Sequence, residues 1–200
     1  MRKLSIRALC VPGLLLLSSC SPRDFLTRRL AGDLIAASGT FSAPQQFQMR
    51  TGVISDKDYH SSEYRALQHR GWISGRNAPC TPALAPPPCW DVSLTPSGVD
   101  AFQSLIAPGD AGKPSFSIAT ARRELIGITG IAKEGNAADV EFSWKWIPLN
   151  EVGAVLYPGD LHYQSTASFR CYDDGWRLVE RVSHPAESLD KALRDSELAH

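Results

Sequence analysis

Two short sequences of the form Asp-x-His contain the residue types of acid–base catalysis. Asp58 lies two residues before His60, and Asp160 lies two residues before His162. A carboxylate that orients an imidazole prepares it for proton transfer near neutral pH, where histidine titrates. The remaining histidines are His69, His184 and His200, and the chain holds neither an HExxH nor a GxSxG sequence. We therefore assign no catalytic residue, metal site or cofactor, and keep an enzyme with a His–Asp pair as the alternative.

Basic, apolar and small residues follow one another at the start of the chain. Arg2, Lys3 and Arg7 form the basic part, and the apolar part extends from Ala8 to Leu17. This order is typical of a secretory signal peptide. The apolar run is about half as long as the roughly 20 residues that a transmembrane helix needs. We therefore expect an exported chain that is not held by a spanning helix.

The end of this segment resembles the signal of a bacterial lipoprotein. Leu17-Ser18-Ser19-Cys20 is similar to the lipobox of that class. The resemblance implies that residues 1–19 are removed and that Cys20 is acylated, with palmitate as a typical acyl group, and becomes the mature N-terminus. Ser21 resembles the pattern that sorts lipoproteins to the outer membrane, facing the periplasm. A plain secretory signal that is cut without lipidation is the alternative.

The composition is that of a globular domain without a basic excess. Hydrophobic residues make up 43% and charged residues 21% of the chain, close to the averages for folded domains. After residue 19 the chain holds 18 basic and 21 acidic side chains. This slightly acidic balance argues against nucleic acid as a partner and against electrostatic adhesion to anionic lipid. We therefore expect membrane attachment to depend on the acyl chains.

Two of the five cysteines bracket a proline-rich loop. Disulfides persist in exported proteins, so we expect Cys80 and Cys89 to be bonded. Closing so short a loop should stabilise the fold by about 2–3 kcal/mol. Their spacing matches no zinc-binding pattern. Cys171 is left over once Cys10 leaves with the signal and Cys20 carries lipid, and we expect it to be reduced and buried.

Two tryptophans lie in the clearest strand pattern of the chain. Val140, Phe142, Trp144 and Trp146 alternate with polar or charged residues, which is typical of a half-buried strand. One interpretation is that Trp144 and Trp146 line a groove for a hydrophobic ligand, a peptidoglycan sugar or a partner. The other is that they fill a core against a helix. The period-two alternation with charged neighbours favours the core.

Helical patterns dominate the first half of the chain and strand patterns the second half. Helices are expected over Asp24–Ala37, over Asp58–Arg70, from Pro96 after the N-cap Thr95, and over Ser188–Leu198. Strands are expected over Phe47–Ile54, Trp90–Leu94 and Ser165–Tyr172 and from Arg122 onward, with turns at Gly135-Asn136 and Asp174-Gly175. The pattern predicts an α+β fold in which short helices pack on a mostly antiparallel C-terminal sheet.

Residues Tyr64–Phe102 resemble part of a winged helix-turn-helix regulator. Ala66–Ile73 is similar to the end of its recognition helix, and Trp90–Gly98 to its second wing strand and the following helix. The resemblance implies a winged-helix-like arrangement in the N-terminal half. Where such regulators carry a basic wing, this chain has the uncharged segment Ala83–Pro88. We therefore expect this arrangement to be used without DNA.

These patterns divide the chain into four parts. They are the signal (1–19), a helical α+β half with the proline loop (20–120), an antiparallel β half of the same domain (121–183) and a charged C-terminal tail (184–200). The expected function is that of a non-enzymatic, lipid-anchored envelope protein that binds a partner or a small ligand in the periplasm.

Overall fold

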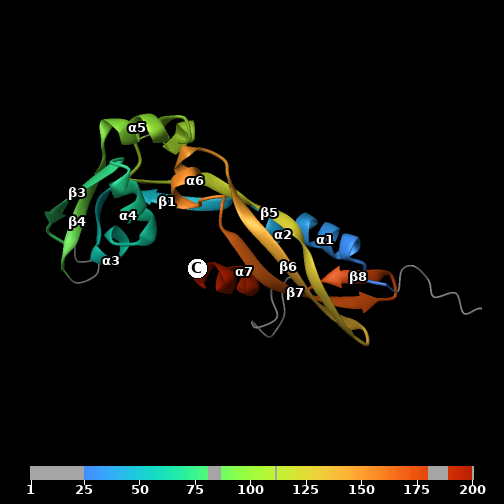
Figure 1. The fold of residues 1–200 in the computed structure, drawn as a ribbon. Coiled ribbons are helices and arrows are strands. Elements are labelled where there is room, and N and C mark those ends of the chain that lie inside the picture. The colour runs from blue at the N-terminus through green and yellow to red at the C-terminus, as the bar shows by residue number, and fades with distance from the viewer. Residues whose placement is uncertain (1–24, 81–86, 111, 180–188, 200) are drawn as a thin grey trace, which may run out of the picture.

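The computed structural model describes residues 25–80, 87–110, 112–179 and 189–199. It has the predicted α+β fold, and all strand pairs in the described residues are antiparallel. Those strands form one five-stranded and one three-stranded sheet. Figure 1 shows the two sheets toward opposite ends of an elongated molecule.

The larger sheet has the strand order β1–β5–β6–β7–β8. Its strands are β1 (Gln45–Arg50), β5 (Ser115–Glu134), β6 (Ala137–Pro148), β7 (His162–Tyr172) and β8 (Gly175–Leu178). Two register shifts in β5, between Leu125 and Gly127 and between Ile128 and Gly130, bend this long strand. The sheet curls around the first helix, which contacts both β5 and β8.

One face of the larger sheet and three helices enclose the larger core, and together they form the large lobe. The helices are α1 (Arg28–Ala37), α2 (Gly39–Ser42) and α7 (Leu189–Leu198). β6 buries alternate residues, namely Ala138, Val140, Phe142, Trp144 and Trp146. The helices add Ile35, Phe41 and Leu193 to the same cluster. The period-two pattern in the sequence therefore marks the core face of the sheet, as predicted.

The smaller sheet has the order β2–β4–β3 and belongs to the small lobe. Its strands are β2 (Gly52–Ser55), β3 (Ile73–Ala78) and β4 (Cys89–Leu94). The helices of this lobe are α3 (Asp56–Tyr59), α4 (Ser62–His69), α5 (Pro96–Gln103) and α6 (Glu151–Leu156), and a short 3-10 helix spans Pro108–Asp110. Its core includes Leu67, Trp72, Phe102 and Val152, together with residues from β1 and the start of β5. β1 and β5 therefore contribute to both lobes.

The predicted helix over Asp58–Arg70 is two helices. Ser61 interrupts it because its side chain accepts a hydrogen bond from the Tyr64 amide and caps α4. Gly71, with a φ of 74°, ends α4 as predicted. β3 and α6 were not predicted, because β3 has few apolar residues and α6 is only six residues long. The start of β5 was predicted at Arg122, whereas the strand begins at Ser115.

The predicted start of α5 is confirmed. Thr95 is the N-cap, its side chain accepts a hydrogen bond from the Gly98 amide at 3.1 Å, and Pro96 follows it. The Thr95 hydroxyl also lies 2.6 Å from the carbonyl oxygen of Gly71, to which it donates. A Cβ at Gly98 would lie 1.9 Å from the carbonyl oxygen of Trp72. α5 therefore approaches the chain before β3 at a distance that glycine alone permits.

The boundary expected after residue 120 falls within β5. The predicted charged tail contains α7, whose Leu189 and Leu193 are buried in the large lobe. Two segments far apart in the sequence, α1 and α7, thus cover the same sheet.

Candidate functional site

The predicted disulfide is present. Cys80 and Cys89 are bonded, with their Cα atoms 5.3 Å apart. Cys171 is free, but it is half-buried instead of buried, because it lies near the exposed end of the β7–β8 hairpin. Cys20 lies outside the described residues, so its acylation stays a prediction. No helix in the described part of the chain is long and apolar enough to cross a membrane.

His60 has an aspartate partner, but not the one in its Asp-x-His sequence. Its Nδ1 lies 3.1 Å from an oxygen of Asp56, whereas Asp58 lies 3.6 Å from Arg50. Asp56 also accepts a hydrogen bond from the Trp90 indole at 2.8 Å. The side chains of His60 and Asp56 are 41% and 44% exposed and line none of the hollows described below. The pair is therefore half-exposed and apart from the candidate binding surfaces.

The other predicted pair is not formed. His162 is exposed at the start of β7, where it lies across from Lys145, and Asp160 precedes the strand. Among the described residues, no group of three or more His, Cys, Asp or Glu side chains is arranged to hold a metal ion.

The two tryptophans of β6 lie in the core, as their alternation favoured. Trp144 is 0% and Trp146 1% exposed. Trp144 stacks on Tyr163 with ring centroids 4.5 Å apart, and its indole N–H donates to Ser165 at 3.0 Å. Trp146 also borders a hollow of about 200 Å³ with Tyr157 and Tyr163. Their main role is to fill the large lobe.

A hollow between α1 and β5 combines charge with apolar surface. Its volume is about 720 Å³. Its charged lining includes the arginines Arg28, Arg29, Arg122 and Arg123. Its apolar lining includes Ala36, Phe41, Leu125 and Ile128. We call this feature the arginine hollow. It lies along the edge of β5 that faces β1. β1 pairs with this edge only as far as Ala121, and no other described strand pairs with it.

The arginine hollow forms because α1 lies close against the bent part of β5. A Cβ at Gly32 would lie 3.3 Å from a methyl carbon of Leu125, so a larger residue would require the Leu125 side chain to shift by a few tenths of an ångström. The Arg28 guanidinium donates to the carbonyl oxygens of Ile128 and Thr129, both at 3.3 Å. These bonds occupy acceptors on the strand edge, which would otherwise be open to pairing with another chain.

Arg123 lines the arginine hollow, but its side chain points inward. Its side chain is 12% exposed and lies 3.4 Å from Glu197 of α7. It donates to the carbonyl oxygen of Thr40 at 3.1 Å and lies 4.6 Å from the ring centroid of Trp146. A buried guanidinium with these partners is a structural link between β5, α2 and α7.

Arg29 and Arg122 point outward and are available to a ligand. Their side chains are 94% and 52% exposed. Arg29 lies 3.9 Å from Asp33, and Arg122 lies 3.8 Å from Glu124. Such long, exposed ion pairs contribute little and are readily exchanged for a better acceptor. The outer rim of the hollow therefore carries two weakly held guanidinium groups.

These arginines were not predicted from the sequence as a site. The signal that could have found them is a pair of doublets, Arg28-Arg29 and Arg122-Arg123. Neighbouring side chains in a strand point to opposite faces, and those in a helix are separated by about 100°. In each doublet one arginine, Arg28 or Arg123, donates to backbone carbonyls, and the other lies at the rim.

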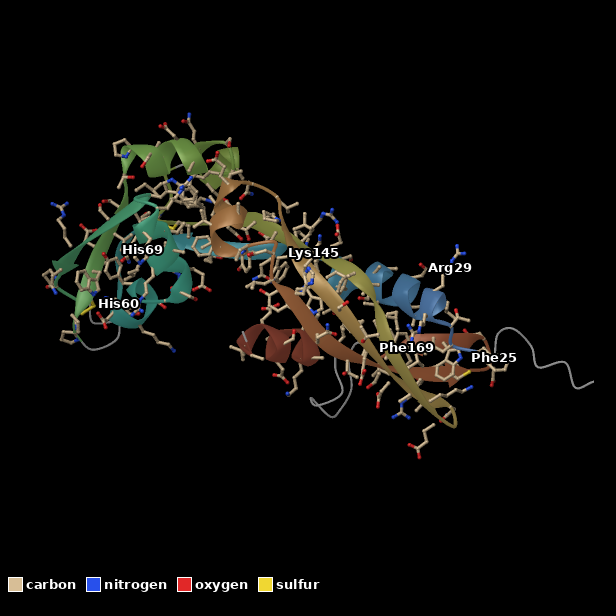
Figure 2. The ribbon with its side chains drawn as sticks, viewed as in Figure 1. Phe25, Arg29, His60, His69, Lys145 and Phe169 are labelled. Carbon is tan, nitrogen blue, oxygen red and sulfur yellow. A yellow bond between two sulfur atoms is a disulfide. The ribbon has the colours of Figure 1, made fainter. Side chains whose placement is uncertain are left out.

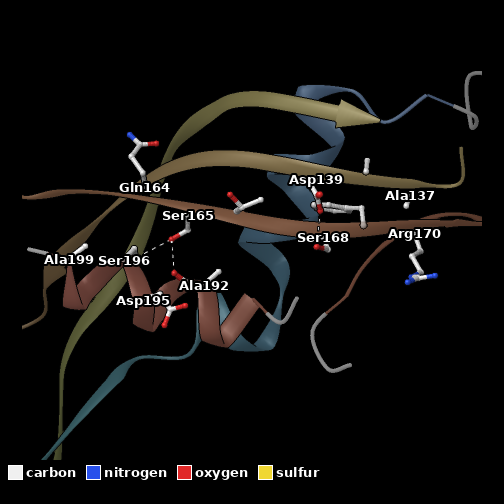
Figure 3. Close-up of a pocket in the computed structure, with 13 residues that line it drawn as sticks. Ala137, Asp139, Gln164, Ser165, Ser168, Arg170, Ala192, Asp195, Ser196 and Ala199 are labelled. Atoms are coloured by element: carbon white, nitrogen blue, oxygen red, sulfur yellow. Dashed lines mark hydrogen bonds between the residues drawn. The ribbon is translucent and has the colours of Figure 1, made fainter. Parts of the chain in front are cut away.

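A second hollow lies between β7 and α7 (Figure 3), and its volume is about 660 Å³. Most of its lining is small or polar, and several of the polar groups bind one another. Ser165 donates to Ser196 at 3.0 Å, and Ser168 donates to Asp139 at 2.8 Å. Figure 3 shows these bonds as dashed lines. Groups already engaged within the protein offer a ligand little.

Three tyrosines with perturbed pKa values gather where the two lobes meet. Burial raises the pKa of Tyr157, and the carboxylates of Glu63 and Glu197 raise it further. Burial also raises the pKa of Tyr163 and of Tyr64. The hydroxyl of Tyr64 bonds both backbone polar groups of Arg50. These neutral phenols fit a packing role better than proton transfer at physiological pH.

Comparison of the chain with protein-family models, with curated proteins and with solved structures finds no match. Function is therefore inferred from the geometry of this chain.

Proposed function

We propose that the protein is a lipid-anchored, non-enzymatic component of the cell envelope that binds an anionic amphipathic ligand in the arginine hollow. The anchor is Cys20, and the expected location is the periplasmic face of the outer membrane. The first part of the proposal rests on the lipobox resemblance, and the second rests on the hollow.

The observation that carries the binding proposal is the joint presence of an exposed cationic rim and an apolar floor. Arg29 and Arg122 lie at the rim. A guanidinium binds phosphate or carboxylate through paired, charge-assisted hydrogen bonds. Leu125 and Ile128 lie in the floor, where an alkyl chain would be removed from water. The volume of about 720 Å³ is in the range of small-molecule sites.

The lining supports binding in preference to catalysis. The carboxylates in it, Asp33 and Glu124, pair with the arginines of the rim, and its one hydroxyl is that of Ser42. No histidine or cysteine belongs to this lining. A nucleophile with an adjacent base, which covalent catalysis requires, is not assembled there. The His60–Asp56 pair is in the small lobe and does not contribute to this hollow.

The test is a calorimetric titration with three probes: decyl phosphate, decyl glucoside and inorganic phosphate. We expect decyl phosphate to bind at least about tenfold more tightly than the others, because it alone uses both rim and floor. The double variant Arg29→Gln/Arg122→Gln should weaken its binding by about tenfold or more. Ala36→Phe, which fills the hollow without a change in charge, should weaken it as well.

The matched control is Arg65→Gln/Arg76→Gln, which removes two exposed arginines from the small lobe. It changes the net charge by the same amount and should leave binding unchanged. Equal binding of decyl phosphate and decyl glucoside, or equal weakening by the two double variants, would contradict the proposal.

The anchor has its own test. Mass spectrometry of the mature protein should find an acylated Cys20 at the N-terminus, and Cys20→Ser should release the protein from membranes. An unmodified N-terminus at another residue would contradict the anchor but leave the binding proposal standing.

A further inference from the structure

β1 has one edge with which no described strand pairs, because β5 is its only neighbour among the described strands. Residues 45–48 of β1 line a hollow of about 320 Å³, and Glu63 and Tyr64 of α4 line it too. Neighbouring residues of a strand point to opposite faces, so a hollow that four consecutive residues line lies along the strand edge. We call this hollow the β1 groove. It lies between the lobes, and Figure 2 labels His69 of α4 on one side of this region and Phe169 of the large lobe on the other.

The backbone polar groups of Gln46 and Gln48 point toward the β1 groove. The Thr51 amide donates to the segment before β5 at 2.8 Å, whereas both backbone polar groups of Arg50 turn the other way and bond the Tyr64 hydroxyl. Residues of an antiparallel strand alternate between these two orientations. The register is regular from Gln46 to Arg50, so Gln48 and Gln46 share the orientation of Arg50. No group in the described ranges bonds them there, so this edge is open to an added strand.

A smaller hollow with aromatic walls adjoins the β1 groove. It is the hollow of about 200 Å³ that Trp146, Tyr157 and Tyr163 border, and we call it the aromatic hollow. Glu63 and Tyr157 line both hollows, which shows that the two meet. Figure 1 shows α4, α6 and α7 around this region. A positively charged group is attracted to the faces of aromatic rings, so walls of this kind favour a cation.

Glu63 supplies a negative charge where the two hollows meet. The other carboxylates of the lining are each paired with an arginine, in the pairs Asp58–Arg50 and Glu197–Arg123. Among the described residues Glu63 forms no ion pair, and its carboxylate accepts a hydrogen bond from the Ser62 hydroxyl at 3.0 Å. Burial raises the pKa of Tyr157, and the Glu63 carboxylate raises it further. One carboxylate therefore lies beside the rings without a cation in the described part of the chain.

We propose that the β1 groove and the aromatic hollow bind an extended peptide segment of a partner protein, which adds a strand to β1 and places a lysine side chain between Glu63 and the aromatic rings. In recognition by strand addition, backbone hydrogen bonds provide affinity and side-chain pockets provide specificity. Gln46 and Gln48 supply the backbone groups. The apolar stem of a lysine packs on rings while its ammonium group bonds a carboxylate. This surface is separate from the arginine hollow, so the inference goes beyond the proposed function.

The test is a calorimetric titration of the protein with acetylated, amidated peptides of five residues. The first has the sequence Thr-Val-Lys-Val-Thr, and the second has norleucine in place of lysine. We expect the lysine peptide to bind at least about tenfold more tightly, because only its ammonium group pairs with Glu63. Equal binding of the two peptides would overturn the lysine assignment.

Two methylated forms of the lysine peptide test strand addition. One is N-methylated at the lysine and the other at both valines. Alternate amides of a strand point to opposite edges, so one form should lose binding about tenfold or more and the other should retain it. Amide exchange should also slow at Gln46 and Gln48 when the lysine peptide binds, but not at Phe47 and Met49, which already face β5. Full binding by both methylated forms would overturn strand addition.

A matched pair of variants tests Glu63. Glu63→Gln should weaken binding of the lysine peptide about tenfold and leave that of the norleucine peptide unchanged. Glu141→Gln, which makes the same charge change at an exposed position of β6, should alter neither. An equal loss of lysine-peptide binding in both variants would overturn the inference.

Two further measurements separate the possible outcomes. n-Butylamine that binds as tightly as the lysine peptide would identify a site for small amines and overturn peptide docking. Arg29→Gln/Arg122→Gln should leave peptide binding unchanged, because the arginine hollow is elsewhere. Loss of decyl phosphate binding without loss of peptide binding would therefore contradict the proposed function alone, and the reverse would overturn this inference alone.

Discussion

The large lobe and the small lobe each contain an antiparallel sheet with helices packed on it, but different interactions stabilise the two lobes. In the large lobe, long strands and bulky side chains dominate. β6 alone contributes Phe142, Trp144 and Trp146 to a core that three helices cover. In the small lobe, the strands are only four to six residues long. Local interactions contribute to its stability, among them the Cys80–Cys89 disulfide and the N-cap hydrogen bond of Thr95.

The difference follows from the amount of apolar surface that each sheet can bury. Stabilisation by burial rises with the area removed from water, and short strands offer little area. The disulfide, which constrains the unfolded chain, and the capped helix ends then account for a larger share of the free energy of unfolding. We therefore expect the large lobe to be most sensitive to loss of core volume and the small lobe to loss of its local constraints.

The largest effect is expected from Trp144→Ala. Removing this fully buried ring should lower the free energy of unfolding by about 3–5 kcal/mol, because it leaves a cavity and removes the stack on Tyr163. Urea denaturation measures the total loss. Amide exchange should show the loss of protection in β6 and β7, with β3 and β4 less affected. Equal loss of protection in both sheets would show that the lobes unfold as one unit and would remove the basis of the comparison.

A smaller effect is expected from Cys80→Ser/Cys89→Ser. Without the bond, the free energy of unfolding should fall by about 2–3 kcal/mol. The amides of β4, which contains Cys89, and of its neighbour β3 should exchange faster, while those of β6 should not. Cys171→Ser is the control, because it removes a free thiol in the large lobe and should change stability by less than about 0.5 kcal/mol. A larger loss from the control would contradict the division.

The smallest effect is expected from replacing the N-cap threonine of two helices. Thr27 caps α1 in the large lobe and Thr95 caps α5 in the small lobe, each accepting from an amide at 3.1 Å. Thr95 also donates to the Gly71 carbonyl. We expect Thr27→Ala to cost about 0.5–1 kcal/mol and Thr95→Ala about 1–2 kcal/mol. Thermal or urea denaturation of both variants gives the two values, and a larger loss from Thr27→Ala would reverse the expectation.

Features that depend on near neighbours in the sequence were predicted well. The alternation of β6, the Thr95-Pro96 helix start, the Gly135-Asn136 turn and the Cys80–Cys89 bond are all present. β3 and α6 were missed because their stability comes from partners. β3 pairs with β4, and α6 packs on β5, where a Cβ at Gly153 would lie 1.8 Å from the Thr120 carbonyl oxygen. No periodicity in the local sequence indicates such contacts.

The candidate site was not predicted, and the reason is distance along the chain. Arg28 and the carbonyl of Ile128 that it binds are 100 residues apart. Likewise, the Asp-x-His spacing indicated Asp58 for His60, but Asp56, one helical turn earlier, lies beside it. A site built from two distant segments of the chain depends on how those segments pack against each other.

The sequence by itself determined the α+β class, the core face of β6, the disulfide and the ends of several helices. Those features follow from side-chain periodicity and from hydrogen bonds between residues a few positions apart. The tertiary structure alone decided which arginine of each doublet bonds backbone carbonyls and that a hollow lies between α1 and β5. It decided these because the bend of β5 and the curl of the sheet arise from pairing along the whole strand, and they set where distant side chains meet.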